Sequence, residues 1–269
     1  MAKRQTTVGG RIATLDVLRV GALCLLFVAH IGQEIHHPLG KFFGYKGFYH
    51  SSLGGVAVTI FLALSGAALY LSSGGRRLPT ADFLTKRLLR IYPVYWMSLV
   101  VAISATLLRS WLRTGQLFGA FPKLHAADIT LSLTGTYAYV GRWGGPFNGV
   151  TWFVGLILSM YLLYPLLAWM FRRHPHLAIL SLAAVSGGVR FLVGKYALLS
   201  MRPLDWFPLC RVFEFAVGMY LVVLWRRVPW RPPRVPRRLG QLLSFLGKLT
   251  FPLFLVHYPL IFLIRHFKK

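Results

Sequence analysis

Long apolar runs alternate with short polar and basic segments along the whole chain. A helix that crosses a bilayer needs about 20 predominantly apolar residues, and seven runs approach that length. They cover residues 15–33, 53–72, 91–112, 150–171, 177–194, 206–225 and 242–264. This pattern predicts an all-α fold: a polytopic bundle of seven to eight transmembrane helices that forms a single domain over residues 1–269.

One further segment determines the topology of the second half of the chain. The segment 128–140 (DITLSLTGTYAYV) is shorter and more polar than each of the seven runs. The segment is compatible with a re-entrant or interfacial position as well as with an eighth span. Each crossing reverses the direction of every later helix, so the orientation of residues beyond 140 depends on this segment.

The charged residues further restrict the class of protein. Only 14% of the residues are charged, and nearly all of these are basic: 31 Lys and Arg against 6 Asp and Glu. A pI near 11.1 is by itself compatible with a nucleic-acid partner. The basic residues, however, lie in clusters between the apolar runs, as the positive-inside rule describes. We therefore expect an integral membrane protein surrounded by lipids, with no nucleic-acid partner.

Three basic clusters predict the orientation: the N-terminal tail, the connection at 76–90, and the segment 226–238 with six arginines. The rule places all three in the cytoplasm, which requires a cytoplasmic N-terminus and a segment 128–140 that does not cross. No small-residue cleavage site follows the first run, so we expect that run to remain as a helix. The expected location is the cytoplasmic (inner) membrane of a bacterium.

The first apolar run carries ionisable side chains on one face. Arg19 and His30 are eleven residues apart, which is about three turns and about 16 Å along a helix, and Asp16 lies one turn before Arg19. Ionisable groups within a membrane usually face a bundle interior and mark a functional site. His30 is suited to general-base work, and Glu34 could orient it. In the alternative interpretation, Arg19 reaches the headgroups and His30 bonds a neighbour.

A second basic pair lies before the third long run. Arg87 and Arg90 in TKRLLRIYPVYW are three residues apart and share a helix face. Guanidinium groups bind phosphate in a bidentate manner, so the pair could hold an anionic ligand at the cytoplasmic mouth of the bundle. The spacing alone favours the simpler interpretation, an anchor that follows the positive-inside rule.

The remaining candidates have simpler structural explanations. Small residues around Ser65 favour close helix packing, and Trp152 and Tyr161 are typical of a core or an aromatic belt. Arg211 and Glu214, three residues apart, favour a neutralising pair within the membrane. His257 taken alone is typical of an interfacial residue. Nothing in the chain has the spacing of a zinc site, and we expect no metal.

Together these segments resemble the acyltransferase family three membrane proteins, which include O-acetylases of bacterial cell-surface polysaccharides. Arg19-x10-His30 is similar to the motif of that family's first helix, and Arg87-x-x-Arg90 with Tyr92 and Pro93 is similar to its third-helix signature. Weaker similarities cover residues 55–66, 152–165, 211–219 and 251–260.

The resemblance implies an activity and its participants. The donor would be cytosolic acetyl-CoA (or another acyl-CoA), and the acceptor a hydroxyl of a cell-surface sugar or of a lipid-linked glycan. His30 would act as the base or carry the acyl group. Arg19, oriented by Asp16, would position the thioester or stabilise the oxyanion. Arg87, Arg90 and Tyr92 would bind the donor.

Two departures from the family pattern keep other functions open. The family typically has about ten helices and often a glutamate where this chain has Ile157. Both the shorter C-terminal half and Ile157 favour a non-catalytic membrane regulator or partner subunit of the same fold. A transporter or flippase with a polar interior is a second alternative, although the chain shows no internal repeat of the kind that such folds often contain.

Overall fold

The computed structural model describes residues 8–34, 53–73, 79–119, 121, 124–140, 144–196, 198, 203–228 and 236–264. Within these ranges every regular element is a helix. The long ones are α1 (Val8–Glu34), α2 (Leu53–Ser73), α3 (Thr80–Thr114), α5 (Trp152–Arg173), α6 (Pro175–Tyr196), α8 (Pro208–Arg227) and α9 (Arg237–Ile264). Short ones are α4 (Ala126–Thr134), η3 (Tyr137–Val140), η4 (Gly149–Thr151) and α7 (Pro203–Trp206).

Seven of these helices are long and apolar enough to cross a membrane. They correspond to the seven apolar runs, which confirms the predicted all-α polytopic fold. One boundary was wrong: α3 begins at Thr80, not near residue 91, so Arg87 and Arg90 lie inside the helix and not at its opening. The segment TADFLTKRLLR contains no Gly or Pro, and Pro79 immediately precedes it, so nothing prevents helix before residue 91.

The segment 128–140 does not cross the bundle. It begins inside α4, a helix of nine residues and about 14 Å, and continues through the 3₁₀ turn η3. Asp128 closes a capping box with His125, accepting from its backbone N–H at 3.0 Å, and Gly135 ends the helix at a φ of 74°. Of the seven to eight spans that the sequence predicts, the described residues therefore form seven.

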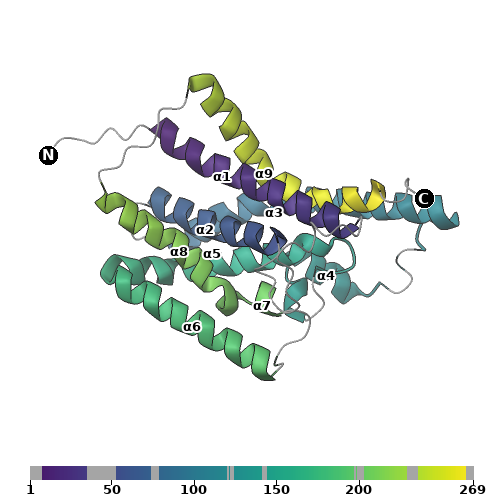
Figure 1. Cartoon of the computed structure of the whole chain (residues 1–269). Coiled ribbons are helices and arrows are strands. Elements are labelled where there is room, and N and C mark those ends of the chain that lie inside the picture. The colour runs from purple at the N-terminus through teal and green to yellow at the C-terminus, as the bar shows by residue number, and fades with distance from the viewer. Residues whose placement is uncertain are drawn as a thin grey trace.

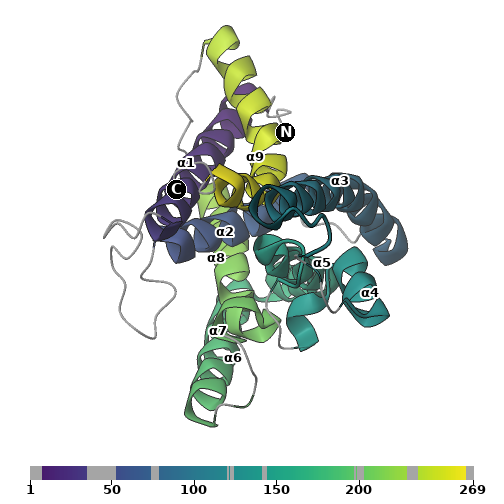
Figure 2. The ribbon, with the colours of Figure 1, turned by 90° about the vertical axis from the view of Figure 1, so that its right-hand side faces the viewer.

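Consecutive long helices alternate in direction (Figure 1). α1, α3, α6 and α9 run one way, and α2, α5 and α8 return. α2 packs against both α1 and α8, α9 packs against α1 and α3, and α6 packs against α8. Seen from the side, α1 with α9, α3 to α5, and α6 with α7 surround α2 and α8 (Figure 2).

Glycines set the spacing at the centre of the bundle. A Cβ atom at Gly66 of α2 would overlap the carbonyl oxygen of Phe215 in α8, and one at Gly218 of α8 would overlap the carbonyl oxygen of Ala63 in α2. The two backbones touch, as small-residue contacts between membrane helices allow. The packing predicted around Ser65 is therefore present, and it is Gly66 beside it that makes the contact.

The exterior is lined by apolar side chains. Leu89, Met97, Leu162 and Leu177 are each more than 60% exposed, although large apolar side chains in soluble proteins are mostly buried. Such a surface is stable only in a lipid environment. Together with the seven long apolar helices, it identifies an integral membrane protein.

Candidate active site

The first and last long helices bring two histidines together. Nδ1 of His30 in α1 lies 2.6 Å from Nε2 of His257 in α9, and the two rings are nearly parallel, at 8°, with their centroids 4.8 Å apart. The ring of Phe27 stacks on His257, and the ring of Tyr258 meets His30 edge-on. His257 therefore does not have the interfacial position expected from the sequence, since its side chain is buried against His30.

The partners of His257 fix the direction of the hydrogen bond. Its Nδ1 lies 2.6 Å from the carbonyl oxygen of Phe254, which only accepts. Nδ1 of His257 therefore carries a proton. In a neutral pair, Nε2 of His257 accepts from Nδ1–H of His30. Nε2 of His30 is then left with a lone pair, which is the form that a general base requires.

Farther along α1, arginines of α1 and α3 lie toward Tyr161 of α5. Arg87 lies over the ring of Tyr161, and Arg19 and Arg90 are near enough for their charges to act on its phenol. Arg19 donates to the buried carboxylate of Asp16, which lies against the backbone of Gly247 in α9. The result is a basic region formed by three helices, about 16 Å along α1 from His30.

Arg87 has a free donor in this region. Its guanidinium carbon lies 5.4 Å from the ring centre of Phe83 and 5.9 Å from that of Tyr161. Its Nε atom is buried, and among the described residues it has no hydrogen-bond partner. An anionic group would satisfy it, because a guanidinium prefers to bind phosphate or carboxylate oxygens.

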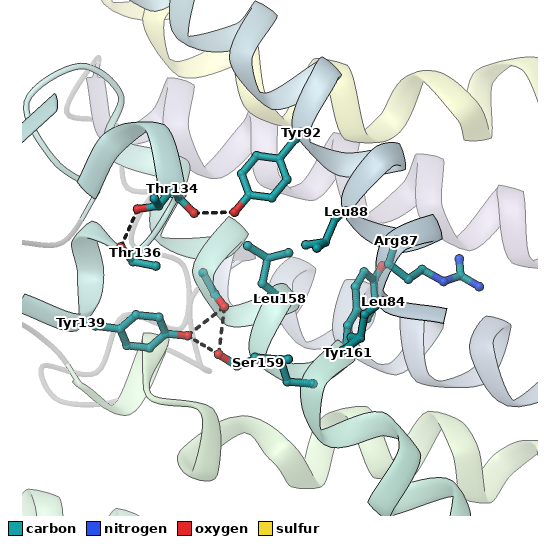
Figure 3. Close-up of a pocket in the computed structure, with 12 residues that line it drawn as sticks. Leu84, Arg87, Leu88, Tyr92, Thr134, Thr136, Tyr139, Leu158, Ser159 and Tyr161 are labelled. Atoms are coloured by element: carbon teal, nitrogen blue, oxygen red, sulfur yellow. Dashed lines mark hydrogen bonds between the residues drawn. The ribbon is translucent and has the colours of Figure 1, made fainter. Parts of the chain in front are cut away.

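Tyr92, predicted with Arg87 and Arg90, has a different position. Its hydroxyl donates to the carbonyl oxygen of Thr134 at the end of α4, at 2.9 Å. It lines a pocket of about 250 Å³ between α3, α5 and the segment of α4 and η3 (Figure 3). The guanidinium of Arg87 points away from this pocket, so the basic region and the pocket lie on different sides of that side chain.

The polar groups of the pocket bond one another. Tyr139 donates to the carbonyl oxygen of Gly155 at 2.8 Å and contacts Ser159, and Thr134 lies 2.7 Å from Thr136. Burial raises the pKa of Tyr139, so its phenol keeps the proton that it donates. Tyr161 and the leucines at positions 84, 88, 158 and 162 also line the wall.

A second charged cluster joins α6 and α8. Nε of Arg211 lies 3.6 Å from Oε1 of Glu214, the pair that the sequence predicts. Arg190 of α6 adds a shorter bond to the same oxygen, at 2.6 Å, and its Nε donates to the carbonyl oxygen of Cys210. Arg211 also reaches Thr59 of α2. One carboxylate thus serves two guanidinium groups.

Other predicted residues are placed as follows. Trp152 and Ile157 are buried in α5. Ser65 is half-buried in α2. The side chain of Glu34 lies outside the described residues.

Arg190 and Asn148 are not among the site residues that the sequence motifs predict. Arg190 is a charged residue within the apolar span 177–194, and such a residue usually marks either a functional site or an ion pair. Asn148 becomes visible only through its partner on α9.

These features define an integral membrane protein whose helix bundle holds an imidazole pair, His30 with His257, and a basic region about 16 Å farther along α1. A family model described as "Acyltransferase domain" matches residues 12–236, and the chain belongs to this family, acyltransferase family three. α9 and His257 follow the matched residues.

Two named relatives match the chain. Acyltransferase MdmB of Streptomyces mycarofaciens is 26% identical over 247 residues, which cover 84% of this chain and 60% of that protein. Exopolysaccharide production protein ExoZ of Rhizobium meliloti (strain 1021) is 30% identical over 79 residues, 29% of this chain and 22% of that protein. The chain therefore spans less than two thirds of either relative. No solved structure matches.

Proposed function

We propose that this membrane acyltransferase moves an acetyl or other acyl group from cytosolic acyl-CoA to a hydroxyl group of a cell-surface sugar or lipid-linked glycan. The observation that carries the proposal is the pairing of His30 with His257, which leaves Nε2 of His30 as a base. The basic region formed by Arg19 of α1 and by Arg87 and Arg90 of α3 supports a donor that carries phosphates.

The reaction needs one proton to move twice. Nε2 of His30 takes the proton of the acceptor hydroxyl, and the acceptor oxygen bonds to the carbonyl carbon of the thioester. The carbon–sulfur bond then breaks, and the departing CoA sulfur receives the proton from His30. His257 holds the imidazole of His30 in the required tautomer throughout, as a hydrogen-bonded partner does in other base sites.

The donor would enter from the end of the bundle that holds Arg19, Arg87 and Arg90. We infer that this end faces the cytoplasm, because basic residues gather there: Lys86 near the start of α3, Arg172 and Arg173 at the end of α5, Arg226 and Arg227 at the end of α8. α8 ends and α9 begins at this same end of the bundle (Figure 1). A cytoplasmic N-terminus follows from the same inference, and the inner membrane of a bacterium is the location that we propose with it.

The acceptor class has weaker support. A glycan fits the name of ExoZ, an exopolysaccharide production protein, over the short region that matches. The name of MdmB specifies only an acyltransferase. A hydroxyl acceptor agrees with the chemistry of a neutral imidazole base, which removes a proton as the oxygen attacks.

The test is binding of acetyl-CoA to purified protein in detergent, followed by transfer to glycan acceptors. Wild type should bind saturably, and the double variant Arg87→Ala/Arg90→Ala should lose binding. Arg113→Ala, which removes a basic residue from the opposite end of α3, is the matched control and should bind as wild type does. No saturable binding by folded wild-type protein would contradict the proposal.

A non-catalytic regulator of the same fold predicts a different result. Ile157 occupies a position where the family often has a glutamate, and it is buried in α5. Donor binding without transfer to any acceptor would favour that function. A transporter or flippase predicts movement of substrate across proteoliposomes without acyl transfer.

A further inference from the structure

Asn148, directly before η4, forms a buried hydrogen bond to α9. Its side chain is 2% exposed, and Nδ2 donates to the carbonyl oxygen of Leu255 at 2.8 Å. Leu255 lies two residues before His257. The bond therefore joins the loop ahead of α5 to the part of α9 that carries the histidine.

The Leu255 carbonyl needs a hydrogen-bond donor from outside α9, because the residue four positions later has no backbone N–H. In a regular α-helix it would accept from the backbone N–H of residue 259. Residue 259 is a proline, which has no N–H and whose ring pushes the carbonyl four residues earlier out of line. A buried carbonyl without a partner costs about 1–3 kcal/mol in proteins. Asn148 supplies the missing donor.

The loop that presents Asn148 is itself fixed. Oδ1 of Asn148 accepts from the backbone N–H of Val150 at 3.3 Å, which orients the amide and leaves Nδ2 facing α9. The hydroxyl of Thr151 lies 2.5 Å from the carbonyl oxygen of Gly144 and 2.9 Å from that of Asn148. Hydrogen bonds within the segment 144–151 therefore orient the Asn148 amide independently of its contact with α9.

A second contact at the same place reaches His30. Gly149 lies against the ring of Tyr258, and the ring of Tyr258 in turn meets His30 edge-on with centroids 5.4 Å apart. The segment 148–149 thus touches α9 on both sides of His257 in sequence: at Leu255 through a hydrogen bond and at Tyr258 through packing.

We propose that Asn148 is a positioning residue for the histidine pair. By satisfying the carbonyl that Pro259 leaves without a donor, it holds residues 255–259 of α9 in the orientation that places His257 against His30. Its importance for activity rests on the proposed acyltransferase function. Its effect on the geometry of the pair does not.

The first experiment measures geometry without activity. His30→Cys and His257→Cys are combined in a background with Cys24→Ser and Cys210→Ser, and the rate of bridging by a short bifunctional thiol reagent is measured. Asn148→Asp keeps an oxygen for the Val150 N–H but removes the donor to Leu255. It should slow bridging several-fold. Ser186→Ala, which removes a comparable buried bond from Ser186 to the Cys210 carbonyl, should leave bridging unchanged.

Pro259 provides the internal control. Pro259→Ala restores a backbone N–H that can bond the Leu255 carbonyl, so Asn148→Asp should slow bridging much less in that background than in the presence of Pro259. An equal effect in both backgrounds would overturn the proposal. So would wild-type bridging in Asn148→Asp.

Kinetics on protein with both histidines intact complete the test. Asn148→Asp should lower kcat by about a hundredfold, the order expected for a small misplacement of a catalytic group, with an unchanged KM for the donor. A raised donor KM with normal kcat would contradict a positioning role. If the wild-type protein transfers no acyl group, the proposed function fails, and the bridging rates still decide the role of Asn148.

Discussion

His30 and His257 share a hydrogen bond of 2.6 Å although 227 positions separate them in sequence. The bond joins α1 to α9, and its direction is set by the carbonyl oxygen of Phe254 behind His257. The pair is therefore more than two nearby imidazoles, because only one of the four ring nitrogens, Nε2 of His30, is left to accept a proton in the neutral state.

Substitution of the two histidines should have unequal effects. His30→Ala removes the base and should lower kcat by about 10²–10⁴-fold. His257→Ala removes the partner that fixes the tautomer, and we expect a smaller loss, because part of the neutral His30 population can still present a lone pair on Nε2. Acyl transfer to a soluble acceptor measures both. Wild-type kcat in His30→Ala would contradict the assignment of the base.

Arg87→Ala should weaken donor binding with little change in kcat. A hydrogen bond to a charged group contributes about 1.5–3 kcal/mol, which corresponds to roughly a tenfold to a hundredfold rise in the KM for acyl-CoA. The control donor is the dephospho-CoA thioester, which lacks the 3′-phosphate. If Arg87 contacts the 3′-phosphate, Arg87→Ala should raise the KM for this donor less than the KM for acyl-CoA. If Arg87 contacts the pyrophosphate, it should raise both equally. An unchanged KM for both donors would leave Arg87 as a membrane anchor.

The contact between α2 and α8 should not tolerate a methyl group. Gly66→Ala and Gly218→Ala each force a Cβ into a backbone carbonyl of the facing helix, and overpacking of this kind costs about 1–3 kcal/mol or more. Both variants should show a lower Tm in detergent. Gly187→Ala on α6, where a Cβ meets nothing within 4 Å, should retain the wild-type Tm or exceed it.

The charged cluster of α6 and α8 should respond most strongly to loss of its carboxylate. Glu214→Gln removes the group that both Arg190 and Arg211 contact, and breaking a buried ion pair costs about 3–5 kcal/mol. Arg190→Gln leaves Glu214 beside Arg211 and should destabilise less. Thermal unfolding followed by light scattering ranks the two variants, and the reverse order would show that Arg190 is the main partner of the cluster.

Labelling with a membrane-impermeant thiol reagent tests the orientation. Val228 after α8 and Leu117 after α3 are exposed and lie at opposite ends of the bundle. In a background with Cys24→Ser and Cys210→Ser, Leu117→Cys should react in intact cells. Val228→Cys should react only after permeabilisation. The opposite pattern would place the arginines of 226–238 outside the cell.

The sequence predicted the bundle well because its signals are local. Seven apolar runs of membrane-spanning length read directly as helices, and the low hydropathy of 128–140 separates it from them. The start of α3 was misplaced because the charged turn around Lys86 and Arg87 lowers hydropathy without interrupting the helix. Hydropathy locates the apolar part of a span, and helix ends depend on capping and on breakers such as Pro79.

The candidate site was predictable only in part. The common face of Asp16, Arg19 and His30 follows from helical periodicity alone. The approach of His257, by contrast, depends on how α9 packs against α1, and no spacing within the chain contains that information. The same applies to Arg190 and Asn148, whose partners belong to other helices. Periodicity predicts which residues share a face but not which faces meet.

The glycine contact between α2 and α8 also has a consequence for how this protein can evolve. α2 lies against α1, which carries His30, and against α8, which carries Glu214 and Arg211. A substitution that widens the contact at Gly66 would move both neighbours at once. Natural variation should therefore spare Gly66 and Gly218 together, while the lipid-facing positions of α3 and α6 change freely, and a loss at one glycine should be recoverable only by a compensating change across the same contact.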